Sequence, residues 1–201
     1  MRLVIATGNA GKLKELRELL APPAFDVLPQ SQFTSVSVDE TGLSFIENAI
    51  LKARHAAAAS GLPAIADDSG LEVDVLDGAP GIYSARYAGE GASDEANLRK
   101  LLATLKDVPP AQRTARYQCA LVFMRSARDP SPLICQASWE GRIIDSPRGD
   151  GGFGYDPIFE LSDRAVTVAE LPSAEKNRLS HRGKALRGLV AQLREMYPAG
   201  S

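Results

Sequence analysis

Acidic residues at two places in the chain have the chemistry needed to bind a divalent cation. Asp67 and Asp68 stand side by side, directly after the short apolar run 64–66. Adjacent carboxylates repel each other unless a proton or a cation relieves the repulsion, and hard oxygen ligands of this kind suit Mg²⁺. An ordinary Asp-Ser-Gly turn is the alternative. A third carboxylate, Glu40 at the predicted entrance to a helix, favours the metal site, where a carboxylate can also deprotonate a water molecule.

The segment 7–12 has the composition of a phosphate-binding loop. It lies between a predicted strand and a predicted helix and consists of Thr7, Gly8, Asn9, Ala10, Gly11 and Lys12. Backbone N–H groups at a helix N-terminus attract an anion, glycine lets a phosphate approach the backbone, and lysine adds a positive charge. The segment is not a Walker P-loop, because Ala6 and Leu13 stand where that motif needs Gly and Ser or Thr. Taken alone, it fits a plain strand-to-helix turn with a solvated lysine equally well.

Two segments in the last third of the chain have side chains suited to the rest of a ligand. Phe153, flanked by glycines, can stack on a planar base, and Asp156 can accept hydrogen bonds from it. By itself that composition is more typical of a glycine-rich connection. The segment 176–184 gathers basic side chains at the entry to the last predicted helix. Because cations are unfavourable at a helix N-terminus, this favours an anionic or carbonyl-bearing ligand over a solvated charged face.

Composition excludes several classes of protein. The 201 residues include 23 Lys and Arg against 25 Asp and Glu, a formal net charge of −2, which argues against a nucleic-acid-coating surface. No apolar run approaches the ~18 residues of a membrane span, and the N-terminus has the pattern of a strand rather than of a secretion signal. The two cysteines, Cys119 and Cys135, lie in strand-like runs and predict buried free thiols in a reducing, cytoplasmic setting.

Strands and helices alternate early in the chain and a hairpin comes late. The expected elements are a strand at 2–6, a helix at about 11–21 that ends at Pro22-Pro23, a strand at 25–28, a helix that starts at the capping box of Ser44 and Glu47, a helix that starts at Ser93, a hairpin of 116–125 with 133–144, and a C-terminal helix. This order predicts an α/β fold with a mixed sheet, and the length fits one domain over residues 1–201.

Six motifs, in their order along the chain, resemble the inosine triphosphate pyrophosphatase family, whose bacterial members are non-canonical purine NTP pyrophosphatases, or XTP/dITP diphosphatases. Each motif is weak alone, but the ordered set is specific and covers the chain from residue 3 to about 195. The motifs are Thr7 to Lys12, Glu40 to Ala49, Asp67 to Leu71, Gly78 to Tyr87, Phe153 to Pro157 and Ser180 to Ala185.

The resemblance implies a fold and an activity. The fold is an elongated α/β structure with two lobes around a long mixed sheet, a cleft between the lobes and a homodimeric assembly. The activity is the Mg²⁺-dependent hydrolysis of ITP, dITP and XTP to the monophosphate and pyrophosphate, which removes deaminated purines from the nucleotide pool.

The resemblance also implies a role for each motif. The loop of Thr7, Gly8, Asn9, Ala10, Gly11 and Lys12 holds the triphosphate, with Lys52 and Arg86 as further phosphate contacts. Glu40 and Asp68 bind the metal, Asp68 is also the catalytic proton acceptor, and Ser69 lies next to the substrate. Whether Asp67 shares the role of base stays open. The base and sugar contact Phe153, Gly154, Tyr155, Asp156, Lys176, His181 and Arg182.

Two other functions compete with this one. An enzyme of the same fold could hydrolyse dTTP, UTP or modified pyrimidine nucleotides, although the basic 180–183 cluster and the 153–156 loop favour purines. A nucleotide sensor or nucleic-acid-binding module without catalysis would not need Glu40 and the acidic pair, and nucleic-acid binding would need a basic surplus that this chain lacks.

Overall fold

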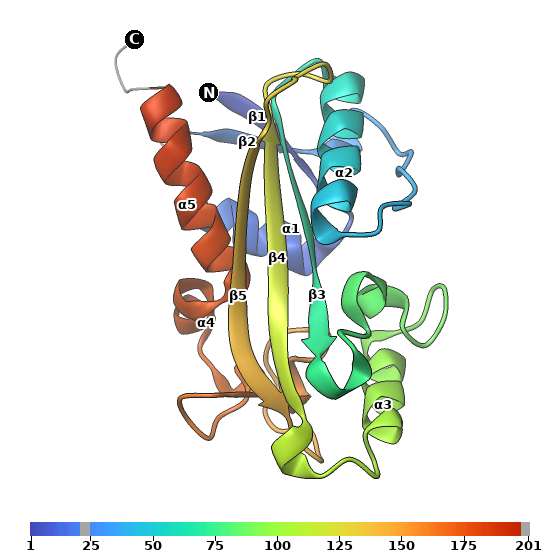
Figure 1. The fold of residues 1–201 in the computed structure, drawn as a ribbon. Coiled ribbons are helices and arrows are strands. Elements are labelled where there is room, and N and C mark those ends of the chain that lie inside the picture. Colours follow the sequence, from blue (N-terminus) through green and yellow to red (C-terminus); the bar gives the residue numbers. More distant parts are fainter. Residues whose placement is uncertain (21–24, 198–201) are drawn as a thin grey trace. The chain divides into compact units, whose positions relative to one another are not determined.

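A computed structural model describes residues 1–20 and 25–197 (Figure 1). The strands are β1 (Arg2–Ala6), β2 (Asp26–Pro29), β3 (Ala64–Val73), β4 (Thr114–Met124), β5 (Leu133–Ile143) and β6 (Phe159–Leu161). The helices are α1 (Ala10–Leu19), α2 (Phe45–Ser60), α3 (Asp94–Thr104), α4 (Ser173–Leu179) and α5 (His181–Met196). Short 3₁₀ helices, among them η3 (Gly81–Arg86) and η5 (Asp156–Ile158), connect them.

The strands form one mixed sheet in the order β2-β1-β3-β4-β5-β6. β1 pairs in parallel with both β2 and β3, whereas β5 and β6 are antiparallel. The predicted mixed α/β fold is therefore confirmed. The predicted stop of the first helix at Pro22-Pro23 lies outside the described residues.

The chain divides into two compact units. The first comprises Met1–Asp68, Cys119–Ala137 and Arg182–Ser201, and the second comprises Ser69–Gln118 and Ser138–His181. Strands β3, β4 and β5 each contribute residues to both units. Among the described residues, no helix is long and apolar enough to cross a membrane.

The first unit buries both faces of its strands. Along β4, alternate residues pack on opposite sides, with Leu121 and Phe123 toward α1 and α5, and Val122 and Met124 toward α2. Such strands are continuously apolar because neither face meets water. The side of α2 that packs on the sheet consists mainly of alanines, which let the helix approach closely. Figure 1 shows α2 and α5 on opposite sides of this part of the sheet.

Two helices begin where the sequence places their caps. The Ser44 side chain accepts a hydrogen bond from the Glu47 N–H at the start of α2, and Gly61 ends that helix in the left-handed conformation. Ser93 caps α3 in the same way through the N–H of Ala96. The core of the second unit lies between α3 and the strands, around side chains such as Leu101, Trp139 and Phe159. Both cysteines are buried and free, as predicted.

Candidate active site

The acidic pair lies within a strand and not at its end. β3 continues without a break from Ala64 to Val73, so the expected interruption at 67–70 and the alternative of an Asp-Ser-Gly turn are both wrong. The neighbouring strand explains the pattern: β1 stops at Ala6, opposite Ala66, so its pairing with β3 ends just before Asp67. The carboxylates thus lie beside the carboxyl end of β1, the end of a parallel strand where ligands bind in open α/β sheets.

Asp67 is held between two cations. It is 1% exposed, and its Oδ2 lies 3.1 Å from Lys12 Nζ and 3.3 Å from Arg182 Nε. Burial acts to raise the pKa of Asp67, but the charges of Lys12 and Arg182 outweigh it and hold the pKa well below its usual range. A carboxylate held in its ionised form by two cations is a poor proton acceptor. Asp67 therefore differs from Asp68 in its surroundings, and the roles of both carboxylates stay predictions.

Asp68 has different partners, because successive side chains of a strand point to opposite faces. Its Oδ1 accepts a hydrogen bond from Lys52 Nζ at 2.8 Å, and its Oδ2 accepts one from Asn48 Nδ2 at 3.3 Å. Burial raises the pKa of Asp68, although the ammonium of Lys52 acts in the opposite direction. A carboxylate with a raised pKa is better matched to taking up a proton near neutral pH.

Lys52 joins Asp68 to Glu40. Its Nζ lies 2.9 Å from Glu40 Oε1 and 2.8 Å from Asp68 Oδ1. Burial acts to lower the pKa of Lys52, but the nearby carboxylates outweigh it and raise the pKa. Two oxygens from distant parts of the sequence thus converge on one cation.

This convergence fits a divalent metal site of low protein ligand number. In the described part of the chain, no three His, Cys, Asp or Glu side chains gather around one point. Mg²⁺ needs only one or two carboxylates and completes its shell with water and phosphate oxygens. Glu40 and Asp68 supply that set, and a metal ion there would take the place of the lysine ammonium.

Asn48 is a site residue that the sequence reasoning missed. It is fully buried, donates to Asp68 Oδ2, and accepts a hydrogen bond from the Gly42 N–H at 2.9 Å. Asn48 therefore ties the loop that carries Glu40 to the strand that carries Asp68. The signal was the spacing of Asn48 and Lys52, four residues apart and hence on one face of a helix, in a stretch where most neighbours on that face are apolar.

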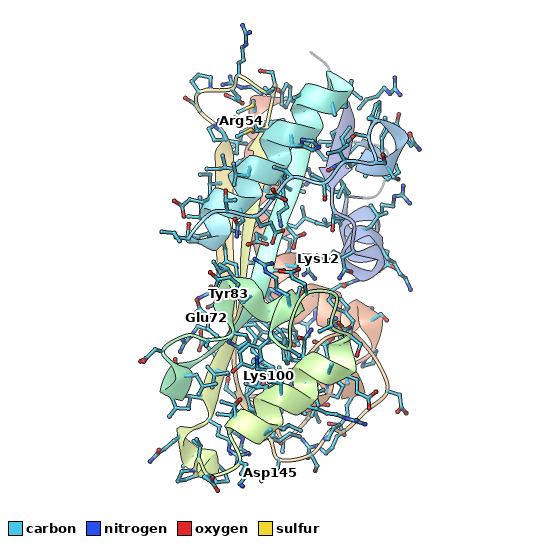
Figure 2. The ribbon with its side chains drawn as sticks, turned by 90° about the vertical axis from the view of Figure 1, so that its right-hand side faces the viewer. Lys12, Arg54, Glu72, Tyr83, Lys100 and Asp145 are labelled. Atoms are coloured by element: carbon cyan, nitrogen blue, oxygen red, sulfur yellow. The ribbon has the colours of Figure 1, made fainter. Side chains whose placement is uncertain are left out.

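The loop 7–12 forms the predicted helix entrance. Asn9 is the N-cap of α1 and accepts a hydrogen bond from the Lys12 N–H at 3.0 Å, while its own N–H donates to Thr7 Oγ1 at 3.2 Å. Gly8 is exposed, with no atom near the position of a side chain, which leaves open space beside the loop. α1 begins at Ala10 and carries Lys12 on its first turn (Figure 2). The remaining amides of this first turn can bind an anion.

Asp156 binds two of the other predicted residues of the second unit, Phe153 and Lys176. It is 4% exposed, and its Oδ2 accepts hydrogen bonds from Lys176 Nζ and from the Phe153 N–H, both at 2.9 Å. Its Oδ1 accepts one from the Tyr117 hydroxyl at 3.0 Å. Lys176 Nζ also lies 4.5 Å from the centre of the Phe153 ring, and His181 stacks on Tyr117. We call Tyr117, Phe153, Asp156, Lys176 and His181 the Asp156 cluster.

A glycine makes the Asp156 contacts possible. Gly152 has φ +76°, and a Cβ there would lie 2.0 Å from Asp156 Oδ2. Any other residue at this position would be strained and would displace the carboxylate. Because both oxygens of Asp156 accept hydrogen bonds from the protein, its observed role is to hold Phe153 and Lys176. Direct contact of Asp156 with a ligand stays a prediction.

The remaining predicted residues have varied surroundings. Tyr155 is buried, with its hydroxyl donating to the Ser84 carbonyl at 2.8 Å, and burial raises its pKa. The Gly154 N–H donates to Asp94 Oδ2 at 2.7 Å, and Ser69 is half-buried. Lys176 lies on α4, a short helix that the sequence reasoning did not separate from α5. Both it and Arg182 are buried, so the basic segment 176–184 is not simply a solvated face.

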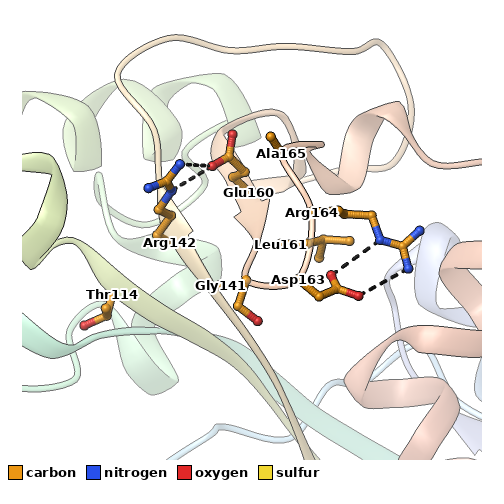
Figure 3. A pocket seen from close by; sticks show the side chains of 9 residues that line it. Thr114, Gly141, Arg142, Glu160, Leu161, Asp163, Arg164 and Ala165 are labelled. Atoms are coloured by element: carbon orange, nitrogen blue, oxygen red, sulfur yellow. Dashed lines mark hydrogen bonds and ion pairs between the residues drawn. The ribbon is translucent and has the colours of Figure 1, made fainter.

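The second unit also contains a cavity of about 440 Å³ (Figure 3). None of its lining residues belongs to the predicted set. Its charged side chains pair with each other: Arg142 Nε donates to Glu160 Oε1 at 2.7 Å, and Arg164 lies against Asp163. The cavity therefore does not serve as the candidate active site.

Comparisons with known proteins cover nearly the whole chain. The profile of the Ham1 family matches residues 3–192. The dITP/XTP pyrophosphatase of Thioalkalivibrio sulfidiphilus (strain HL-EbGR7) is 62% identical over 193 residues, which cover 96% of this chain and 98% of that protein. The protein of the same name from Escherichia coli O157:H7 is 60% identical over 193 residues, which cover 96% of this chain and 98% of that protein. Among solved structures, a HAM1 protein from Coxiella burnetii has a TM-score of 0.90 and 47% identity, with 97% of this chain and 99% of that chain covered. The Ham1 protein of Staphylococcus aureus has a TM-score of 0.86 and 41% identity, with 98% and 100% covered.

Proposed function

The chain belongs to the Ham1 family, and from this premise we propose that it hydrolyses dITP, ITP and XTP to the nucleoside monophosphate and pyrophosphate. This is the family expected from the order of the sequence motifs. The relatives named dITP/XTP pyrophosphatase support the choice of substrate, since they match along almost their full length.

One observation supports the chemistry most directly: Lys52 bridges Glu40 and Asp68. Two carboxylates that already share one cation are placed to share another, and we propose that they hold Mg²⁺. When bound there, the metal would neutralise phosphate charge and help orient the attacking water. Lys52, displaced from between the carboxylates, can then turn its charge toward a phosphate.

The loop 7–12 is proposed to bind the triphosphate. The N-terminus of α1 presents backbone N–H groups, and the positive charge of Lys12 lies at its first turn. Both favour the negative charge that develops on departing pyrophosphate. Asp67, which pairs with Lys12 at 3.1 Å, keeps that ammonium at the carboxyl end of β1.

Asp68 is proposed to accept the proton of the water that attacks the α-phosphorus. Its pKa is raised by burial, whereas the pKa of Asp67 is held low by two cations. Of two adjacent carboxylates, only one is thus suited to proton transfer. This contrast supports Asp68, rather than Asp67, as the proton acceptor.

The Asp156 cluster is proposed to recognise the base. Inosine and xanthine carry a carbonyl acceptor at position 6, where adenine carries an amino donor. In the cluster, the Lys176 ammonium donates to Asp156 and lies over the Phe153 ring, and the His181 imidazole stacks on Tyr117; we propose that Lys176 and His181 donate hydrogen bonds to the base. Adenine would set a donor against these donors, and such unpaired groups support strong discrimination.

A substrate panel tests the function. Pyrophosphate release is measured with dITP, ITP, XTP, dATP, dGTP, dTTP and UTP, each with Mg²⁺ and with a chelator. We expect release from dITP, ITP and XTP only, and only with Mg²⁺. Equal or faster release from dTTP or UTP would establish the pyrimidine enzyme instead, and binding of ITP without any release would establish a sensor.

Assembly and location complete the proposal. We propose a homodimer in the cytoplasm, on the grounds of the family resemblance and of the free cysteines. Light scattering on a size-exclusion column should give twice the chain mass of 21.4 kDa. A mass equal to that of one chain would contradict the dimer.

A further inference from the structure

Tyr117 is the member of the Asp156 cluster that lies on β4, and it belongs to none of the sequence motifs. Its hydroxyl donates to Asp156 Oδ1 at 3.0 Å. Its ring lies parallel to the His181 imidazole, with 4.9 Å between centroids and 14° between planes. The ring also packs on Phe159 at 4.5 Å. One side chain on a strand therefore touches both the carboxylate that holds the loop and the imidazole at the start of α5.

The location of Tyr117 makes it a rigid support. It is 7% exposed and belongs to the core of the second unit, among side chains that include Trp139 and Phe159. The loop 151–155 is held by hydrogen bonds from the Gly151 N–H to the Ala169 carbonyl, from the Phe153 N–H to Asp156 Oδ2 and from the Gly154 N–H to Asp94 Oδ2. The Asp156 carboxylate therefore helps to place Phe153 within this loop, and it also holds Lys176. Tyr117 is the donor that fixes the Oδ1 side of this carboxylate.

We propose that Tyr117 is a positioning residue for base recognition: its hydroxyl orients Asp156, and its ring sets the plane of His181. This inference rests on the proposed function, because it takes Phe153, Lys176 and His181 as the base contacts. Tyr117 itself touches no reacting atom. Its loss should weaken ground-state and transition-state binding of the base equally, which raises KM and leaves kcat unchanged.

The test compares Tyr117→Phe with Tyr197→Phe, which removes a hydroxyl just beyond α5. The affinity for dIMP is measured by calorimetry, and kcat and KM are measured for dITP. Because the lost hydrogen bond goes to a buried carboxylate, Tyr117→Phe should weaken dIMP binding and raise KM by about tenfold, with kcat within about twofold. Tyr197→Phe should match the wild type in all three quantities.

A second variant approaches the same carboxylate from the other side. Gly152→Ala places a methyl group against Asp156 Oδ2 and should also raise KM without lowering kcat. The proposal is overturned if Tyr117→Phe binds dIMP like the wild type, or if either variant lowers kcat at an unchanged KM. A wild type that does not bind dIMP also overturns it. If the wild type binds dIMP but releases no pyrophosphate, the proposed function is wrong. The role of Tyr117 is then decided by the dIMP affinities of the wild type and of Tyr117→Phe.

Discussion

The buried carboxylates Asp68 and Asp156, one in each unit, have different kinds of hydrogen-bond partners. In the first unit, Asp68 shares Lys52 with Glu40. The side chains of Lys52 and Glu40 are 15% and 29% exposed. In the second unit, Asp156 accepts hydrogen bonds from a tyrosine hydroxyl, a backbone N–H and the buried Lys176. The partners of Asp68 are thus two side chains of one helix, whereas Asp156 is held by a backbone N–H and by side chains from two further elements.

This difference suggests a division of labour. In the proposed mechanism, Lys52 leaves the two carboxylates when the metal ion binds, so the metal site rearranges. A base site must keep its shape, because discrimination depends on donors held at set positions. Substitutions in the two regions should therefore have different kinetic signatures.

The largest effect is expected for Asp68→Asn. The amide keeps the volume of the side chain but cannot take up the proton of the water, so kcat should fall by about a thousandfold or more. Stopped assays of pyrophosphate release measure kcat, and calorimetry with dIMP measures binding. Near-normal turnover with Mg²⁺ would show that another group is the base.

A smaller effect of another kind is expected for Lys176→Met. It removes a donor to Asp156 and the cation beside Phe153, so KM for dITP should rise by about thirtyfold while kcat changes little. Lys106→Met, at an exposed position of the same unit, is the control. A fall in kcat equal to the rise in KM would break the proposed contrast between the units.

Asn48→Ala should weaken metal binding and leave recognition of the nucleobase unchanged. It removes the link between Asp68 and the loop of Glu40, and loss of such supporting groups typically costs at least tenfold in metal affinity. Titration with Mn²⁺, followed by electron paramagnetic resonance, measures that affinity. The matched control is Asn97→Ala, a buried asparagine of α3 that bonds the Ala88 N–H and the Ala85 carbonyl. Equal Mn²⁺ affinities in the two variants would show that Asn48 is only structural.

The smallest effect is expected for Asp129, a buried carboxylate outside the candidate active site. Asp129 accepts hydrogen bonds from the side chain of Arg125 and from the N–H groups of Arg125 and Ser131, and these hold its pKa well below the usual range. A depressed pKa stabilises the fold above the unfolded-state pKa of about 3.9, and this stabilisation is lost as the pH falls toward the folded-state pKa. Asp129→Asn should thus lower the free energy of unfolding by about 1 kcal/mol at pH 7.

Urea denaturation at pH 7 and at pH 3 measures this effect. The difference between Asp129→Asn and the wild type should shrink at pH 3, and turnover at pH 7 should be unchanged. A difference that grows as the pH falls would mean that the sign of the pKa shift is wrong.

Much of the fold could be predicted from the sequence because local signals determine it. Ser44 and Ser93 cap their helices where expected, and apolar runs mark the buried strands. The break expected at 67–70 was wrong, since two adjacent carboxylates look like a strand end. Cations brought from α1, α2 and α5 offset their charge, so the strand continues.

The sequence indicated residues of the candidate site, but it did not indicate which of them contact each other. The contact of Arg182 Nε with Asp67 Oδ2, at 3.3 Å, was not predicted, and the expected contact of Arg182 with the base stays a prediction. Asn48, although it lies within the motif Glu40 to Ala49, and Tyr117, which lies in no motif, were not assigned to the site from the sequence. Their roles depend on contacts with residues 20 and 39 positions away, which local patterns do not encode.

The most direct test of the account is whether Glu40 and Asp68 exchange Lys52 for a metal ion. Mn²⁺ binding is measured by electron paramagnetic resonance in the wild type and in Glu40→Gln, together with pyrophosphate release from dITP with Mg²⁺ and with a chelator. We predict that turnover requires the metal and that Glu40→Gln weakens Mn²⁺ binding by tenfold or more. Turnover that persists in the chelator, or Mn²⁺ binding unchanged in Glu40→Gln, would contradict the account.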